Sequence, residues 1–68
     1  MEVKNLQDLC FACPDGTIGV EAGFCTAEFN CKSEKDRLFI YTQAAKIGCS
    51  VNRLDDTFLA VKYGKFGF

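Results

Sequence analysis

The stretch SEKDRLFIYTQAAKIG, residues 33–48, decides the fold, because it alone carries a helical period and signals at both ends. Ser33 can cap the first turn, where Asp36 places negative charge against the free N–H groups. Lys46 suits the exposed carbonyls of the last turn, and Gly48 suits the left-handed conformation that often ends a helix. The pattern predicts an α-helix over residues 33–48.

Six apolar side chains of this helix fall on one half of its surface at about 100° per residue. We expect them to face the core: Leu38, Ile40, Tyr41, Ala44, Ala45 and Ile47. Tyr41 should then lie against Phe29 from the preceding strand.

Phe39 lies about 100° away from Leu38 on this helix, on a polar face with Lys35, Gln43 and Lys46. An aromatic ring flanked by lysines on a polar face is typical of an interface anchor. The alternative is that the other side of the helix is covered too, for example by the C-terminal residues 66–68.

Residues 24–32, FCTAEFNCK, precede the helix and alternate cleanly. One face of this run would carry Cys25, Ala27, Phe29 and Cys31. The other face would carry polar side chains. One buried and one wet face are typical of a strand in an antiparallel sheet.

Residues 6–13, LQDLCFAC, fit both a helical stripe and an alternating strand. The turn-forming sequence Pro14-Asp15-Gly16 follows, and then the alternating run Thr17 to Val20. We therefore predict a β-hairpin of residues 8–13 and 17–22. A short N-terminal helix is the alternative.

Residues 49–56 contain several turn formers and are expected to form an irregular link. Residues 57–63, TFLAVKY, are the last predicted strand, followed by a glycine-containing tail, residues 64–68. The order is β-β-β-α-β in one compact domain, residues 1–68. The predicted fold class is α+β, a small antiparallel sheet with one helix packed on one face.

Composition indicates an ordinary globular chain, with 49% hydrophobic and 25% charged residues. No apolar run approaches the roughly 20 residues that span a bilayer, and the first residues are too polar for a secretory signal. We expect a cytoplasmic protein without membrane contact.

Five cysteines are present, at positions 10, 13, 25, 31 and 49. An odd number cannot pair completely within one chain, which favours reduced thiols. A zinc site could be formed by four of them, Cys10, Cys13, Cys25 and Cys31. Cys25 and Cys31 are six positions apart and would lie roughly 20 Å apart on an unbroken strand, so this site requires that the strand of residues 24–32 is broken. Buried apolar thiols are the preferred interpretation.

Catalytic chemistry has little support in these residues. The sequence contains no histidine, the commonest general base, and its glycines do not match a phosphate-binding loop. We expect no enzyme activity and no cofactor.

Charge is divided unevenly along the chain. Residues 1–31 carry one cation and five acids, whereas residues 32–68 carry seven cations and four acids. The basic half and the aromatic tail, with Tyr63, Phe66 and Phe68 near lysines, could bind nucleic acid. The overall net charge of −1 argues against it as the main partner.

These observations predict a small non-enzymatic domain that docks on a larger protein as a regulator or inhibitor. Small regulators encoded by phages and mobile elements, such as inhibitors of host defence, often have this form. The partner could itself be part of a nucleoprotein complex, and self-association is compatible with the same surface. A nucleic-acid-binding module and a zinc-stabilised domain are the alternatives. The expected partner-binding residues are Phe39, Lys35, Gln43, Lys46, Phe66 and Phe68.

Overall fold

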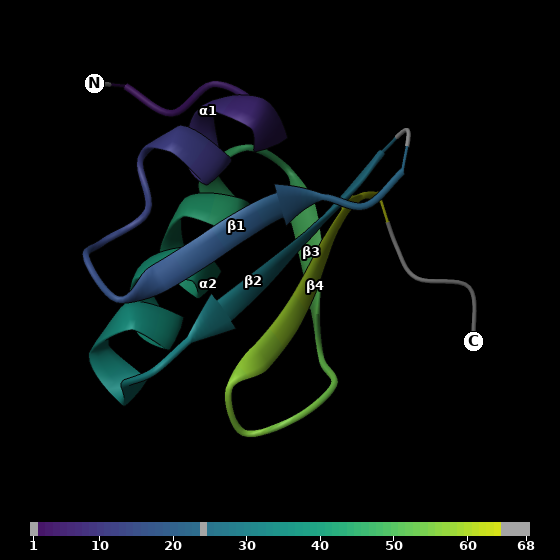
Figure 1. Ribbon diagram of the computed structural model, residues 1–68. Coiled ribbons are helices and arrows are strands. Elements are labelled where there is room, and N and C mark those ends of the chain that lie inside the picture. Colours follow the sequence, from purple (N-terminus) through teal and green to yellow (C-terminus); the bar gives the residue numbers. More distant parts are fainter. Residues whose placement is uncertain (1, 24, 65–68) are drawn as a thin grey trace.

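The computed structural model describes residues 2–23 and 25–64, and it is an α+β fold (Figure 1). Its elements are α1 (Leu6–Phe11), β1 (Thr17–Glu21), β2 (Thr26–Cys31), α2 (Glu34–Lys46), β3 (Cys49–Arg53) and β4 (Phe58–Tyr63). The strands form an antiparallel sheet in the order β1-β2-β4-β3. The predicted fold class is confirmed, although the order is α-β-β-α-β-β.

The predicted helix forms α2, and both of its ends follow the sequence signals. The Ser33 hydroxyl accepts a hydrogen bond from the N–H of Asp36 at 3.2 Å. Ile47 is the C-cap, and Gly48 follows with φ of +77°, a conformation that a side chain would strain.

Residues 6–11 form a helix, so the strand predicted over residues 8–13 is wrong. The side chain of Asn5 caps α1 by accepting a hydrogen bond from the N–H of Asp8 at 2.8 Å. Leu6 and Leu9, one helical turn apart, are both buried. The turn predicted at Pro14 exists, since its carbonyl accepts from the N–H of Thr17, but it joins a helix to a strand.

Residues 49–53 form β3, so the irregular link predicted over residues 49–56 is also wrong in its first part. In the described part of the chain, β3 lies at one edge of the sheet and pairs with β4. Its first four residues do alternate, with Cys49 and Val51 packed against the core, but the strand is only five residues long and runs into the turn formers of residues 52–56.

The core lies between the sheet and the two helices, which share one side of the sheet in Figure 1. Phe29 is fully buried, as predicted. Its ring covers Gly19 on β1, the residue directly opposite, where a Cβ atom would lie only 2.7 Å from Cε1 of Phe29. The buried residues of this core are Leu6, Leu9, Ala27, Phe29, Cys31, Ile40, Ala44, Leu59 and Val61.

The helix α2 presents a different face to the core from the one predicted. Ile40 and Ala44 are buried, and Phe39 packs against the core cluster. Leu38 is 64% exposed and Tyr41 36% exposed, so neither is a core residue. The helix is apolar on too many sides for the helical period alone to fix its rotation.

The two halves of the chain are arranged alike. α1-β1-β2 and α2-β3-β4 are each a helix followed by a hairpin, and a shift of 32 residues (49 − 17 and 58 − 26) carries β1 onto β3 and β2 onto β4. Gly16 and Gly48, at φ of +94° and +77°, precede the first strand of each half. The β2–β4 pair therefore lies on an approximate two-fold axis.

Candidate functional site

The strongest candidate is the face of the sheet that neither helix covers. Because Ala27, Phe29 and Cys31 point into the core, the alternate residues of β2 point the other way. The same alternation applies to the other strands through their register. We call this surface the open face; its residues are Ile18, Val20, Thr26, Glu28, Asn30, Ser50, Asn52, Phe58, Ala60 and Lys62.

Four of the ten residues of the open face are apolar. Ile18 is 65% exposed and Val20 57% exposed, both on the edge strand β1. Phe58 is half-buried and lies in the same cross-strand row as Ile18, with the exposed Asn30 between them. Leu54, also exposed, extends this row, since its N–H donates to the carbonyl of Phe58 at 2.9 Å.

Charge on the open face is sparse and balanced. Glu28 and Lys62 are its only ionisable residues, on neighbouring central strands. A low density of charge around exposed apolar side chains is typical of the centre of a protein–protein interface. Nucleic acid needs several cations near one another, and the open face supplies one.

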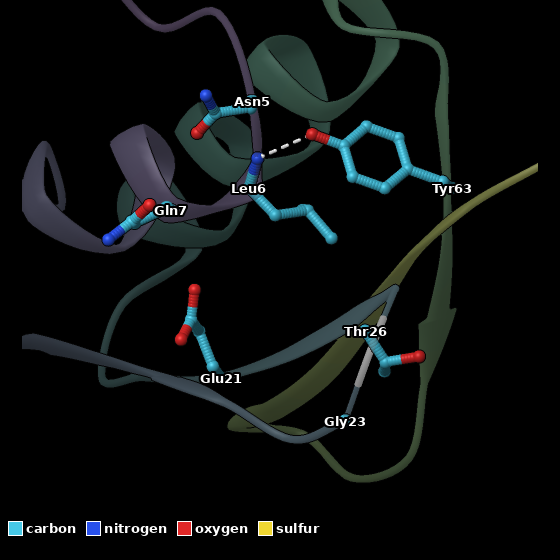
Figure 2. A pocket seen from close by; sticks show the side chains of 7 residues that line it. All are labelled: Asn5, Leu6, Gln7, Glu21, Gly23, Thr26 and Tyr63. Carbon is cyan, nitrogen blue, oxygen red and sulfur yellow. Dashed lines mark hydrogen bonds between the residues drawn. The ribbon is translucent and has the colours of Figure 1, made fainter.

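A cleft of about 190 Å³ lies at the end of the β1–β2 hairpin, beside α1 (Figure 2). The hydroxyl of Tyr63 faces the start of α1 there and accepts a hydrogen bond from the N–H of Leu6 at 2.8 Å. Glu21 is the one ionisable carboxylate of the lining, which has neither a cation nor a thiol. Ligand pockets are usually about 300 Å³ or more, so this cleft suits a structural contact better than a substrate.

The thiols near α1 are held in the neutral form. Burial raises the pKa of Cys13 to about 11, and the neighbouring Cys10 and Cys31 add to the effect. Burial, with the charge of Glu21, also raises the pKa of Cys10. A reactive or metal-binding cysteine needs the thiolate, which this environment disfavours.

All five cysteines are free thiols. Within residues 2–23 and 25–64, no three cysteine or acidic side chains are grouped so that they could hold a metal ion. In the same part of the chain, no helix is long and apolar enough to cross a membrane.

Four of the six residues expected to bind a partner lie on α2. The expected exposure of Phe39 is wrong, because its side chain is half-buried against the core. Lys35 and Lys46 are exposed and Gln43 is half-buried, all on α2. Phe66 and Phe68 lie outside the described residues.

Sequence reasoning missed the open face as a site. The alternation of residues 17–22 correctly indicated a strand, but both faces of this run carry small or apolar side chains. Which face a sheet exposes depends on where the helices pack, and that information is not local. The exposed β-branched pair Ile18 and Val20 was the available signal.

No protein-family model, no curated protein and no solved structure significantly matches the chain.

Proposed function

We propose that the chain is a non-enzymatic binding domain that docks on another protein through its open face, as a regulator or inhibitor. The observation that carries the proposal is the uncharged row of Ile18, Asn30 and Phe58 across three strands, in which Ile18 is exposed and Phe58 is half-buried. A weakly charged face with exposed apolar side chains fits a protein surface of similar polarity.

The open face is a better candidate than α2. The outer side of α2 has Leu38 and Tyr41 exposed, but charged residues lie one helical turn away, Glu34 and Lys35 from Leu38 and Arg37 from Tyr41. α2 also packs on the opposite side of the sheet, so one flat partner cannot contact both surfaces. Contacts by Lys35, Gln43 and Lys46 would need a partner that wraps around the domain.

The chemistry of the side chains supports a binding role over catalysis. The sequence has no histidine. The pKa of Cys13, raised by burial, makes it a poor nucleophile at neutral pH. Free thiols also support our proposal that the protein works in a reducing cytoplasm.

The test begins by placing a photo-crosslinking aromatic amino acid at Phe58, or at Leu38 as the control, in the source cell. We expect one discrete protein to be crosslinked from position 58 and not from position 38. The captured protein is then produced separately and titrated with the purified chain.

Asn30→Lys is the decisive variant, because it adds a charge to the middle of the apolar row at an exposed position. Thr42→Lys makes the same change on exposed α2. Asn30→Lys should weaken binding by about 2 kcal/mol or more, roughly thirtyfold, with an unchanged melting temperature. Thr42→Lys should bind like the parent. Equal binding by parent and Asn30→Lys would refute the proposal.

A further inference from the structure

We infer that a second copy of the chain pairs with the outer edge of β1, antiparallel and centred on Gly19, so that two sheets join into one. The inference concerns the edge of the sheet, whereas the proposed function concerns its open face. The two stand or fall separately.

The backbone of β1 leaves its outer edge unpaired. The N–H of Ala22 donates to the carbonyl of Thr26. Every second residue of an antiparallel strand bonds to the same neighbour, so Val20 and Ile18 also bond to β2. Gly19 and Glu21 therefore direct their N–H and C=O groups outward. No hydrogen bond to a third segment satisfies these outward groups in residues 2–23 and 25–64.

Access to this edge is open. Gly19 is half-exposed and Glu21 is exposed. α1 packs over both β1 and β2, so it lies above the sheet and not along its margin. Natural proteins often protect an edge strand with charged side chains, especially lysine, with proline or with a bulge, and of these β1 has only the charge of Glu21 at its end.

The sequence of β1 is complementary to itself in this register. Gly19 lies opposite Gly19 of the second copy, so the two residues exchange both backbone hydrogen bonds. The N–H of Glu21 then meets the carbonyl of Thr17 of the second copy. The N–H of Thr17 already donates to Pro14 at 3.0 Å and needs no new partner.

The side chains agree with the same register. Ile18 lies opposite Val20 of the second copy, and by symmetry Val20 lies opposite Ile18, on the open-face side. β-branched pairs across antiparallel strands are favourable. Each Glu21 lies opposite a threonine, at the far end from the other Glu21, so no like charges oppose one another. A parallel arrangement would place the two carboxylates side by side.

The other edge is less suited to pairing. β3 places polar Ser50 and Asn52 on the open-face side, where β1 has Ile18 and Val20. Both strands end on a charged residue, Glu21 on β1 and Arg53 on β3, so the two edges differ in these open-face side chains. β1 is therefore the edge that a second copy should select.

The first test is amide hydrogen exchange of the parent protein by NMR at rising protein concentration. The N–H groups of Gly19 and Glu21 should exchange at least about tenfold more slowly once the dimer dominates, because they become hydrogen-bonded. The outward amides of β3, at Val51 and Arg53, should not change. Protection of β3 in place of β1, or no concentration dependence at millimolar protein, would overturn the inference.

The second test is sedimentation of edge variants. Glu21→Pro removes the outward N–H without breaking a β1–β2 hydrogen bond, so the monomer should still fold. It should raise the dimer dissociation constant at least about tenfold, since the contact is lost twice in a symmetric pair. Glu21→Ala retains the N–H and should dimerise like the parent.

Arg53→Pro places the same change on the other edge and should leave dimerisation intact. A folded Glu21→Pro protein that dimerises as strongly as the parent would contradict β1 pairing. Asn30→Lys, which tests the open face, lies on β2 away from this edge. A protein that dimerises but binds no partner would support the inference and refute the proposed function. A monomeric protein that binds its partner would do the reverse.

Discussion

The ring of Phe29 occupies the space in which Gly19 would have a side chain. The two residues face each other across β1 and β2, and a Cβ at position 19 would lie 2.7 Å from Cε1 and 2.9 Å from Cδ1 of the ring. The Sγ atom of Cys13 closes the other side at 3.1 Å. Gly19 is thus required by packing, because its backbone does not have a positive φ.

Gly19→Ala should therefore destabilise the protein by about 1–3 kcal/mol, the usual effect of overpacking a core. Phe29→Leu removes the ring edge that the new methyl group meets. In a double-mutant cycle by urea unfolding, Gly19→Ala should cost less in the Phe29→Leu background than in the parent. Strictly additive effects would mean that the methyl group and the ring do not meet.

Tyr63→Phe should loosen α1 selectively. The Tyr63 hydroxyl accepts from the N–H of Leu6, one of the first-turn donors that a helix cannot satisfy internally. Losing it should reduce the free energy of unfolding by about 1 kcal/mol. Exchange of the α1 amides should accelerate more than exchange of the β2 amides. Tyr41→Phe on exposed α2 is the matched control and should change neither quantity.

The rotation of α2 can be tested with two neighbouring residues. Phe39 packs on the core and Leu38 is largely exposed, so Phe39→Ala should lower the free energy of unfolding by well over 1 kcal/mol. Leu38→Ala should change it by less than about 0.5 kcal/mol. The reverse order in thermal unfolding would support the helix face that the sequence predicted.

Cys13 should respond slowly to alkylating reagents. With a pKa of about 11 instead of 9.0, its thiolate fraction at pH 8 is about a hundredfold lower. Mass spectrometry of iodoacetamide-treated protein should show position 13 modified far more slowly than glutathione in the same tube. Comparable rates would mean that the thiol is neither buried nor perturbed.

Because folding raises the pKa of Cys13, the free energy of unfolding should depend on pH in the alkaline range. Below about pH 9 the thiol is protonated in both states. Between about pH 9 and 11 the unfolded chain loses this proton more readily than the folded one, so stability falls as pH rises. Cys13→Ala should show a shallower fall over this window in chemical unfolding.

The sequence predicted those elements whose signals are local. Ser33 and Gly48 marked the ends of α2, and the alternation around Phe29 located β2 and its buried side. α1 was only the alternative prediction, because so short a helix shows little more than one turn of periodicity and a genuine turn at Pro14 favoured a hairpin.

The open face was harder to predict from the sequence. The exposure of Ile18 and the burial of Phe39 both depend on which sides of the sheet and of α2 meet in the core. That choice is made by long-range packing, and neither β1 nor α2 has a sufficiently one-sided apolar pattern to indicate it. The sequence therefore placed Phe39 on an exposed face, although its side chain packs against the core.

The approximate two-fold arrangement of α1-β1-β2 and α2-β3-β4 has a consequence for how the chain folds. Within each half, the hairpin closes between residues near in sequence, as with Val20 and Glu28 or Val51 and Val61. Among the strand pairs of the described residues, β2–β4 is the one that joins segments distant in sequence, for example Phe29 with Leu59. Loop closure makes such distant pairing the slow event. The transition state should therefore resemble two formed hairpins that have just met along β2 and β4, with Phe29 at the point of contact.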